Sequence, residues 1–186
     1  DYKRMHNAGR GSILYSFRGF LLRNMKIEEG ARQRSRRRIS FSINSSTNPF
    51  RRKDFSKQIA AVNDAFPNNT EVEVKTYEKA GLTLEEQIES AMDTSVFVSV
   101  IGGSTSIASF LPRGSTLILF FNDENSFVGK TRKKDTMPTM MDYDFWNNAA
   151  YVRVHWLPTG SMDEALGIQT LVRLIENELS IASMIE

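Results

Sequence analysis

Cysteine is absent from the 186 residues, and histidine occurs only twice. The absence of cysteine excludes both a disulfide framework and a zinc site with thiolate ligands. The two histidines, His6 and His155, stand in no metal-ligand spacing, so we expect no metal site. No run of 18 or more apolar residues occurs, which excludes a membrane-spanning helix. The chain opens on aspartate without a signal-peptide pattern, so we expect a fragment of a longer protein, in which any anchor or targeting segment would lie upstream.

The composition is that of one folded domain spanning residues 1–186, with 40% hydrophobic and 25% charged residues. The charge is uneven, since residues 1–53 carry 14 Lys and Arg against 3 acidic residues, whereas residues 54–186 carry 10 against 19. The basic residues centre on segment 32–38. That segment is interpreted either as a polyanion-binding patch or as a solvated stretch before a strand. It lacks interleaved aromatic residues, so we expect no nucleic-acid partner.

Stretches with helical and strand-like spacing alternate along the chain. Apolar residues three and four positions apart predict helices, and alternating or continuous apolar runs predict strands. The predicted helices cover residues 12–25, 53–66, 82–92, 104–111, 143–150 and 162–185, and the predicted strands cover 38–43, 71–77, 95–101, 115–121 and 151–156. Residues 122–142 lack clear periodicity and are expected to form a long loop. This order predicts an α/β fold, a Rossmann-like parallel sheet with helices on both faces.

Two loops of this fold are candidates for a ligand site, because open parallel sheets bind ligands at the carboxyl ends of their strands. The loop after strand 38–43 supplies polar and basic candidates: Asn44, Ser45, Arg51 and Arg52. The loop after strand 95–101 joins two glycines to three hydroxyls: Gly102, Gly103, Ser104, Thr105 and Ser106. Glycines let a ligand approach the backbone closely, and the free amides at a helix start favour an anion such as phosphate.

Each loop alone has a plain structural alternative. The glycine turn is equally interpreted as a tight strand-to-helix turn that binds nothing, and the basic residues as solvated charges beside the next helix. The turn also lacks the Lys-Ser/Thr ending of a Walker loop. If strands 38–43 and 95–101 are neighbours, however, both loops face one crevice. Arg51 or Arg52 is then expected to pair with a diphosphate held at residues 102–106.

Other candidates for catalysis are weaker. His155 lies in a predicted strand between two apolar residues, which favours a structural role. Asp142 and Asp144 have a spacing that fits a divalent metal, but they follow a loop rather than a clear strand. The segment at 121–125, which follows a strand and carries an aspartate and a glutamate, is similarly ambiguous. We therefore name no catalytic residue.

Several short motifs follow one another in a fixed order: FRGFLL at 17–22, RRRISFSINSS at 36–46, LTLEEQI at 82–88, FLPRGSTLI at 110–118 and YVRVHW at 151–156. Over roughly residues 17–158 this order resembles the carboxyl-terminal half of family-61 (DUF563-like) glycosyltransferases. That family usually carries a His-Gly-Ala-Gly turn, and Ile101 stands here where the histidine would be.

The resemblance implies one half of a two-domain GT-B enzyme, the half that binds the sugar donor. The implied function is inverting transfer of a sugar from a UDP-sugar to a hydroxyl of a glycan or glycoprotein acceptor, without a metal or other cofactor. The implied location is the Golgi, in a type II membrane protein of the secretory pathway. The alternative is a non-catalytic module that binds an anion or a glycan through a degenerate donor site.

Overall fold

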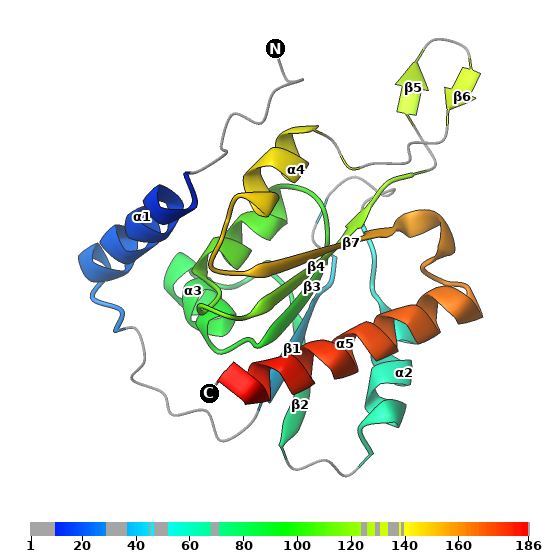
Figure 1. Ribbon diagram of the computed structural model, residues 1–186, viewed down its shortest axis with the longest axis horizontal. Coiled ribbons are helices and arrows are strands. Elements are labelled where there is room, and N and C mark those ends of the chain that lie inside the picture. The colour runs from blue at the N-terminus through cyan, green and yellow to red at the C-terminus, as the bar shows by residue number, and fades with distance from the viewer. Residues whose placement is uncertain are drawn as a thin grey trace.

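The computed structural model describes residues 10–28, 37–44, 46, 52–67, 71–123, 126–128, 131–133, 138 and 140–185. They form a central sheet with helices on both of its faces (Figure 1). Within these ranges, no helix is both long enough and apolar enough to cross a bilayer.

The central sheet has five strands, and all of them run parallel. In spatial order they are β2 (Val72–Tyr77), β1 (Arg37–Ser42), β3 (Val96–Val100), β4 (Thr116–Phe121) and β7 (Arg153–Pro158). Every residue of β3 and β4 is buried, as their continuous apolar runs predict for strands covered on both faces. The predicted α/β fold with a Rossmann-like parallel sheet is therefore confirmed.

The strand order reverses between β1 and β3. The chain passes from β1 to β2 on one side and then returns to add β3 on the other side of β1. Ile39 pairs with Val96 and Phe41 with Val98, so the two strands end side by side. In open parallel sheets this reversal is the place where ligands bind.

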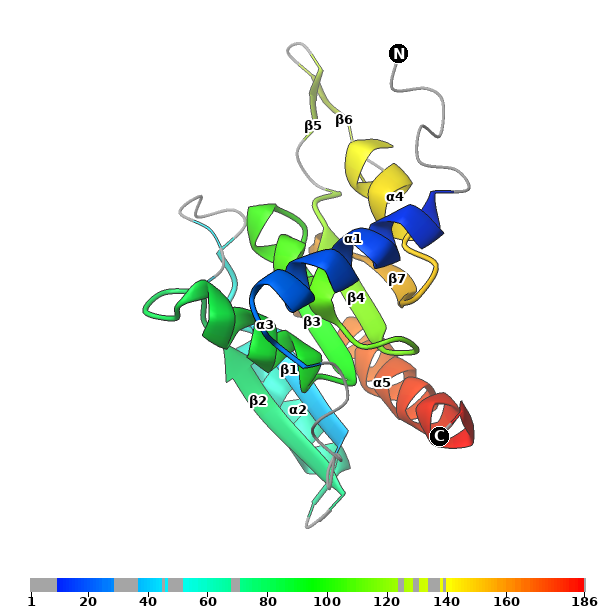
Figure 2. The ribbon, with the colours of Figure 1, turned by 90° about the vertical axis from the view of Figure 1, so that its left-hand side faces the viewer.

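Two layers of helices cover the sheet (Figures 1 and 2). The helices α2 (Ser56–Ala65) and α5 (Ala165–Ile185) pack together on one face, over a core that includes Val62 and Leu171. The opposite face carries α1 (Gly11–Asn24), α3 (Leu84–Met92), the 3-10 helix η1 (Gly103–Phe110) and α4 (Met140–Asn147).

Some local structure differs from the sequence prediction. The stretch expected as a loop at 122–142 holds a hairpin, β5 (Ser126–Val128) and β6 (Thr131–Lys133), and the first residues of α4. A short 3-10 helix, η2 (Thr159–Ser161), follows β7. The helix after β3 is also of the 3-10 kind, and it ends before Gly114, whose φ of +82° suits glycine.

Candidate functional site

The two loops predicted to share a crevice begin at neighbouring strand ends. Asn44 lies two residues beyond the end of β1, and Gly102 lies two residues beyond the end of β3. The condition on which the predicted site depends, that these strands are neighbours, is met by their pairing. Ser45 and Arg51 lie outside the described residues, as does the side chain of Ser104.

Asn44 organises the loop after β1. It adopts a left-handed backbone conformation with φ +50°, which asparagine tolerates better than most residues. Its backbone amide donates to the carbonyl of Lys53 at 2.9 Å, so the two ends of the loop at 44–53 are held together. Its side-chain Nδ2 donates to Glu78 at 3.2 Å, and its Oδ1 accepts from Nε of Arg52 at 3.3 Å.

The hydrogen bond from Nε of Arg52 to Asn44 leaves the two terminal nitrogens of the Arg52 guanidinium available for another contact. Arg52 is exposed, and within the part of the chain that the structure describes only its Nε makes a hydrogen bond. The two terminal nitrogens of an arginine have the spacing that recognises a phosphate bidentately. The candidate role of Arg52 thus remains compatible with its surroundings.

The glycine turn after β3 requires glycine at one position and leaves room at the next. Gly102 has φ +151° and ψ −173°, a conformation that side chains other than glycine rarely adopt. A Cβ on Gly103 would meet no atom within 4 Å, so this backbone faces open space. A ligand group can therefore approach the main chain at Gly103 without displacing protein atoms.

The hydroxyls of Thr105 and Ser106 bond to carbonyls of the turn itself, whereas the sequence pattern suggested them as ligand-binding groups. Thr105 is buried, and its Oγ1 donates to the carbonyl of Gly102 at 2.6 Å. Ser106 is exposed, and its Oγ donates to the carbonyl of Gly103 at 2.8 Å. Each hydroxyl proton therefore holds the turn, as does the backbone amide of Thr105, which donates to the carbonyl of Gly102 at 3.0 Å.

The starts of α3 and η1 contrast with each other. Thr83 and Glu86 form the predicted capping box at the start of α3, with the Thr83 amide donating to Glu86 at 2.7 Å. These hydrogen bonds lower the pKa of Glu86. No side chain caps η1. The two helix starts therefore differ in whether a side chain bonds to their first backbone amides.

Asp123 is a buried carboxylate at the carboxyl edge, two residues beyond β4. The sequence pattern left the role of its segment, 121–125, ambiguous. Its Oδ1 accepts the amide of Gly160 at 2.7 Å and lies 3.4 Å from Oγ1 of Thr159. A Cβ on Gly160 would come within 2.9 Å of the other carboxylate oxygen. Asp123 therefore anchors η2 to the end of β4, a role for which its position just after a buried strand was the only sequence signal.

His155 belongs to a buried polar cluster at the opposite end of the strands. Its Nε2 lies 2.9 Å from Oε1 of Glu178 on α5, and Glu178 also accepts from Nε of Arg153 and from the hydroxyl of Thr116. Burial raises the pKa of Glu178, but the hydrogen bonds from Thr116 and Arg153 outweigh burial and lower it below 4.5. These contacts give His155 a structural role.

The remaining sequence candidates do not gather into a site. Asp144, buried on α4, accepts a hydrogen bond from Asn148 at 3.3 Å, one helical turn later. Among the described residues no three His, Asp or Glu side chains are placed to hold a metal ion. In the basic segment, Arg38 is paired with Glu73 at 3.1 Å and Asp93 at 3.4 Å. Residues 32–36 lie outside the described ranges.

Comparison with known proteins corrects the family resemblance. No family model and no curated protein matches this sequence. A solved structure with a similar fold is a flavodoxin-like domain from Synechococcus sp., which is 11% identical with a TM-score of 0.44. The match covers 80% of this chain and 97% of that domain.

The assignment to family-61 glycosyltransferases is therefore wrong. The motifs behind it, a buried strand, a glycine turn and a capped helix, are devices that any parallel α/β sheet uses to join strands to helices. The fold prediction depends only on periodicity, so it is unaffected by this correction.

Proposed function

We propose that the crevice between the carboxyl ends of β1 and β3 binds the diphosphate of a nucleotide sugar. The observation that carries this proposal is the pairing of β1 with β3, because the loop with Asn44 and Arg52 and the Gly102–Gly103 turn then start from neighbouring strand ends. Open backbone at Gly103 and a basic fork at Arg52 are two features that suit a phosphate.

In this proposal the chain acts as the donor-binding domain of a glycosyltransferase. The amides at the start of η1 would bind the phosphates, and Arg52 would offset the negative charge that develops on the leaving nucleotide. Thr105 and Ser106 would hold the turn in shape through their bonds to the carbonyls of Gly102 and Gly103. The acceptor, a glycan or glycoprotein hydroxyl, and a Golgi location stay predictions.

Calorimetric titration with UDP and UDP-sugars tests the site, with uridine as the ligand that lacks phosphates. Gly103→Val fills the open space beside the backbone, and we expect it to weaken UDP binding about tenfold or more, since it blocks the approach of a phosphate. Arg52→Ala should weaken binding about fivefold, and Lys57→Ala, on α2, is the control for loss of a surface cation. Equal affinity for uridine and UDP would contradict a phosphate site.

A non-catalytic anion-binding module is the second candidate, because the hydroxyl protons of Thr105 and Ser106 are already used within the turn. Release of UDP from a UDP-sugar separates the two candidates. Transfer to an acceptor, lost in Gly103→Val, supports the transferase. Binding of UDP without any release of the sugar, across a panel of UDP-sugars and acceptors, supports the module.

A further inference from the structure

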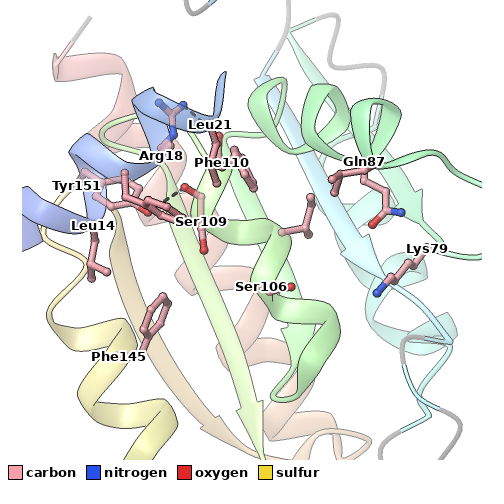
Figure 3. A pocket seen from close by; sticks show the side chains of 13 residues that line it. Leu14, Arg18, Leu21, Lys79, Gln87, Ser106, Ser109, Phe110, Phe145 and Tyr151 are labelled. Carbon is pink, nitrogen blue, oxygen red and sulfur yellow. Dashed lines mark hydrogen bonds between the residues drawn. The ribbon is translucent and has the colours of Figure 1, made fainter. Parts of the chain in front are cut away.

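A cavity of about 420 Å³ lies between α1, the start of α3 and η1, on the sheet face opposite to α2 and α5 (Figure 3). Its volume falls in the range of roughly 300–1,000 Å³ that is usual for small-molecule sites. Figure 3 shows Lys79 and Gln87 at one side, Ser106 between, and Leu14, Phe145 and Tyr151 at the other. The residues that line the cavity come from α1, α3, η1, α4 and the segments that carry Lys79 and Tyr151.

The lining is mostly apolar, and the apolar surface continues outside the cavity. Aromatic side chains from three elements and a loop contribute to it: Phe17, Phe110, Phe145 and Tyr151. Phe17 and Leu84 line the cavity although they are 57% and 58% exposed, so they form its rim. Exposed Ile13 and Phe20 lie near Phe17 on α1, and Phe20 stacks against it with ring centroids 6.5 Å apart. Apolar rims of this kind mark binding surfaces.

The charge of the lining has one sign. Among the described residues that line the cavity, Arg18 and Lys79 are the charged ones, and both are cations. Arg18 is buried, donates to the carbonyl of Phe110 at 3.1 Å and lies against the ring of Tyr15. Its guanidinium is therefore fixed in the wall. Lys79 is exposed, and within the described ranges no ion pair engages its Nζ.

The polar groups beside Lys79 are already engaged. Gln87 accepts from the hydroxyl of Tyr77 at 3.1 Å and donates to the carbonyl of Leu82 at 3.0 Å. The hydroxyl proton of Ser106 goes to the carbonyl of Gly103. Lys79 is thus the group at this end of the cavity that is able to turn toward a ligand and bind an anionic headgroup.

We propose that this cavity binds a single-chain amphiphile with an anionic headgroup, of the kind represented by a medium-chain carboxylate. The apolar chain lies against Phe110, Phe145 and Tyr151, and the carboxylate lies at Lys79. Burial of the chain supplies most of the affinity, since each methylene removed from water is favourable, and the cationic lining selects an acid over a neutral molecule of equal length. This cavity shares Ser106 with the turn of the proposed nucleotide site, and its occupation needs no nucleotide.

Calorimetric titration of the full chain with decanoate, and with 1-decanol as a neutral ligand of equal length, tests the proposal. Lys79→Glu should weaken decanoate binding about fivefold and leave decanol binding unchanged, because only the acid contacts the cation. Ser109→Met extends a side chain into the cavity and should weaken binding of both ligands about tenfold. Lys57→Glu is the matched control, an equal charge change on the far face of the sheet.

In the titrations, any of four outcomes overturns the proposal: no binding of decanoate to the wild-type chain, equal weakening by Lys57→Glu and Lys79→Glu, unchanged binding in a folded Ser109→Met variant, or an equal loss of acid and alcohol in Lys79→Glu. If Ser109→Met does not fold, the pair of lysine variants decides the matter, since both lysines are exposed. Flotation with phosphatidylcholine–phosphatidylserine vesicles separates a free amphiphile from a membrane. Capture by vesicles without binding of monomeric decanoate also overturns the proposal.

Discussion

The central sheet has an amino edge, where its strands begin, and a carboxyl edge, where they end, and the side chains at these two edges make different contacts. At the amino edge, polar side chains bond to one another: Arg38 with Glu73 and Asp93, and Arg153 with Glu178. At the carboxyl edge between β1 and β3, the chain presents a glycine turn with open backbone and an exposed arginine. Side-chain pairs therefore link elements at the amino edge, whereas the backbone of Gly103 and the side chain of Arg52 are left exposed at the carboxyl edge.

Hydroxyls follow the same division. Ser40 and Thr94 are 2.7 Å apart at the amino edge, and Ser115 donates to the carbonyl of Thr94 at 3.0 Å, which joins β1 and β4 to the start of β3. At the carboxyl edge Thr105 bonds only within its own turn. The hydroxyl bonds of the amino edge link distant parts of the chain, whereas those of Thr105 and Ser106 shape one local turn.

The largest expected effect is a loss of stability in a variant of the amino edge. Glu178→Ala removes the acceptor that Thr116, Arg153 and His155 share, and should lower the free energy of unfolding by about 3 kcal/mol, since it leaves the buried hydroxyl of Thr116 and the partly buried Arg153 and His155 without their carboxylate. Urea unfolding measures this loss. Glu176→Ala, an exposed glutamate on the same helix, should change stability by less than about 0.5 kcal/mol. An equal effect of the two variants would contradict the assigned role.

A smaller effect separates two glycines of the carboxyl edge. Gly102→Ala places a side chain at φ +151° and should cost about 2 kcal/mol, because that conformation is nearly restricted to glycine. Gly103→Ala has free space and should leave stability within about 0.5 kcal/mol. Thermal unfolding of both variants measures the contrast. Equal losses would show that Gly103 is packed rather than open.

The smallest effect is the dependence of the amino edge on pH. The folded-state pKa of Glu178 lies below its ordinary value of 4.5, so its ionised form stabilises the fold above that value and the stabilisation is lost as pH falls through the folded pKa. The difference in unfolding free energy between wild type and Glu178→Gln should be constant above pH 4.5 and shrink below it. Urea unfolding across a pH series measures this difference. A difference that grows on acidification would contradict the sign.

The pattern of apolar residues along the chain predicted the strands of the sheet, but it did not predict which hydrogen bonds the side chains make. Continuous apolar runs identify β3 and β4 because strands buried on both faces need them, and the spacing of Thr83 and Glu86 identifies a helix start because a capping box is local. The hydrogen bond of Thr105, by contrast, depends on the 3-10 geometry of η1, which residue types do not encode separately from an α-helix.

Long-range contacts were also beyond the sequence. Arg18 resembles an ordinary polar residue of an amphipathic helix, yet it is buried against the carbonyl of Phe110, 92 residues away. The cavity beneath α1 exists only because α1 packs across η1 and α4, and no local pattern reports that packing. The family resemblance was wrong because it was based on local motifs that many α/β sheets share.

The hydrogen bond from Gly160 to Asp123 has a consequence for conformational entropy at the carboxyl edge. Because the segment after β7 is already attached to the end of β4, a ligand there does not need to order it. At the site proposed above, the ordering cost of binding would therefore not include the segment after β7.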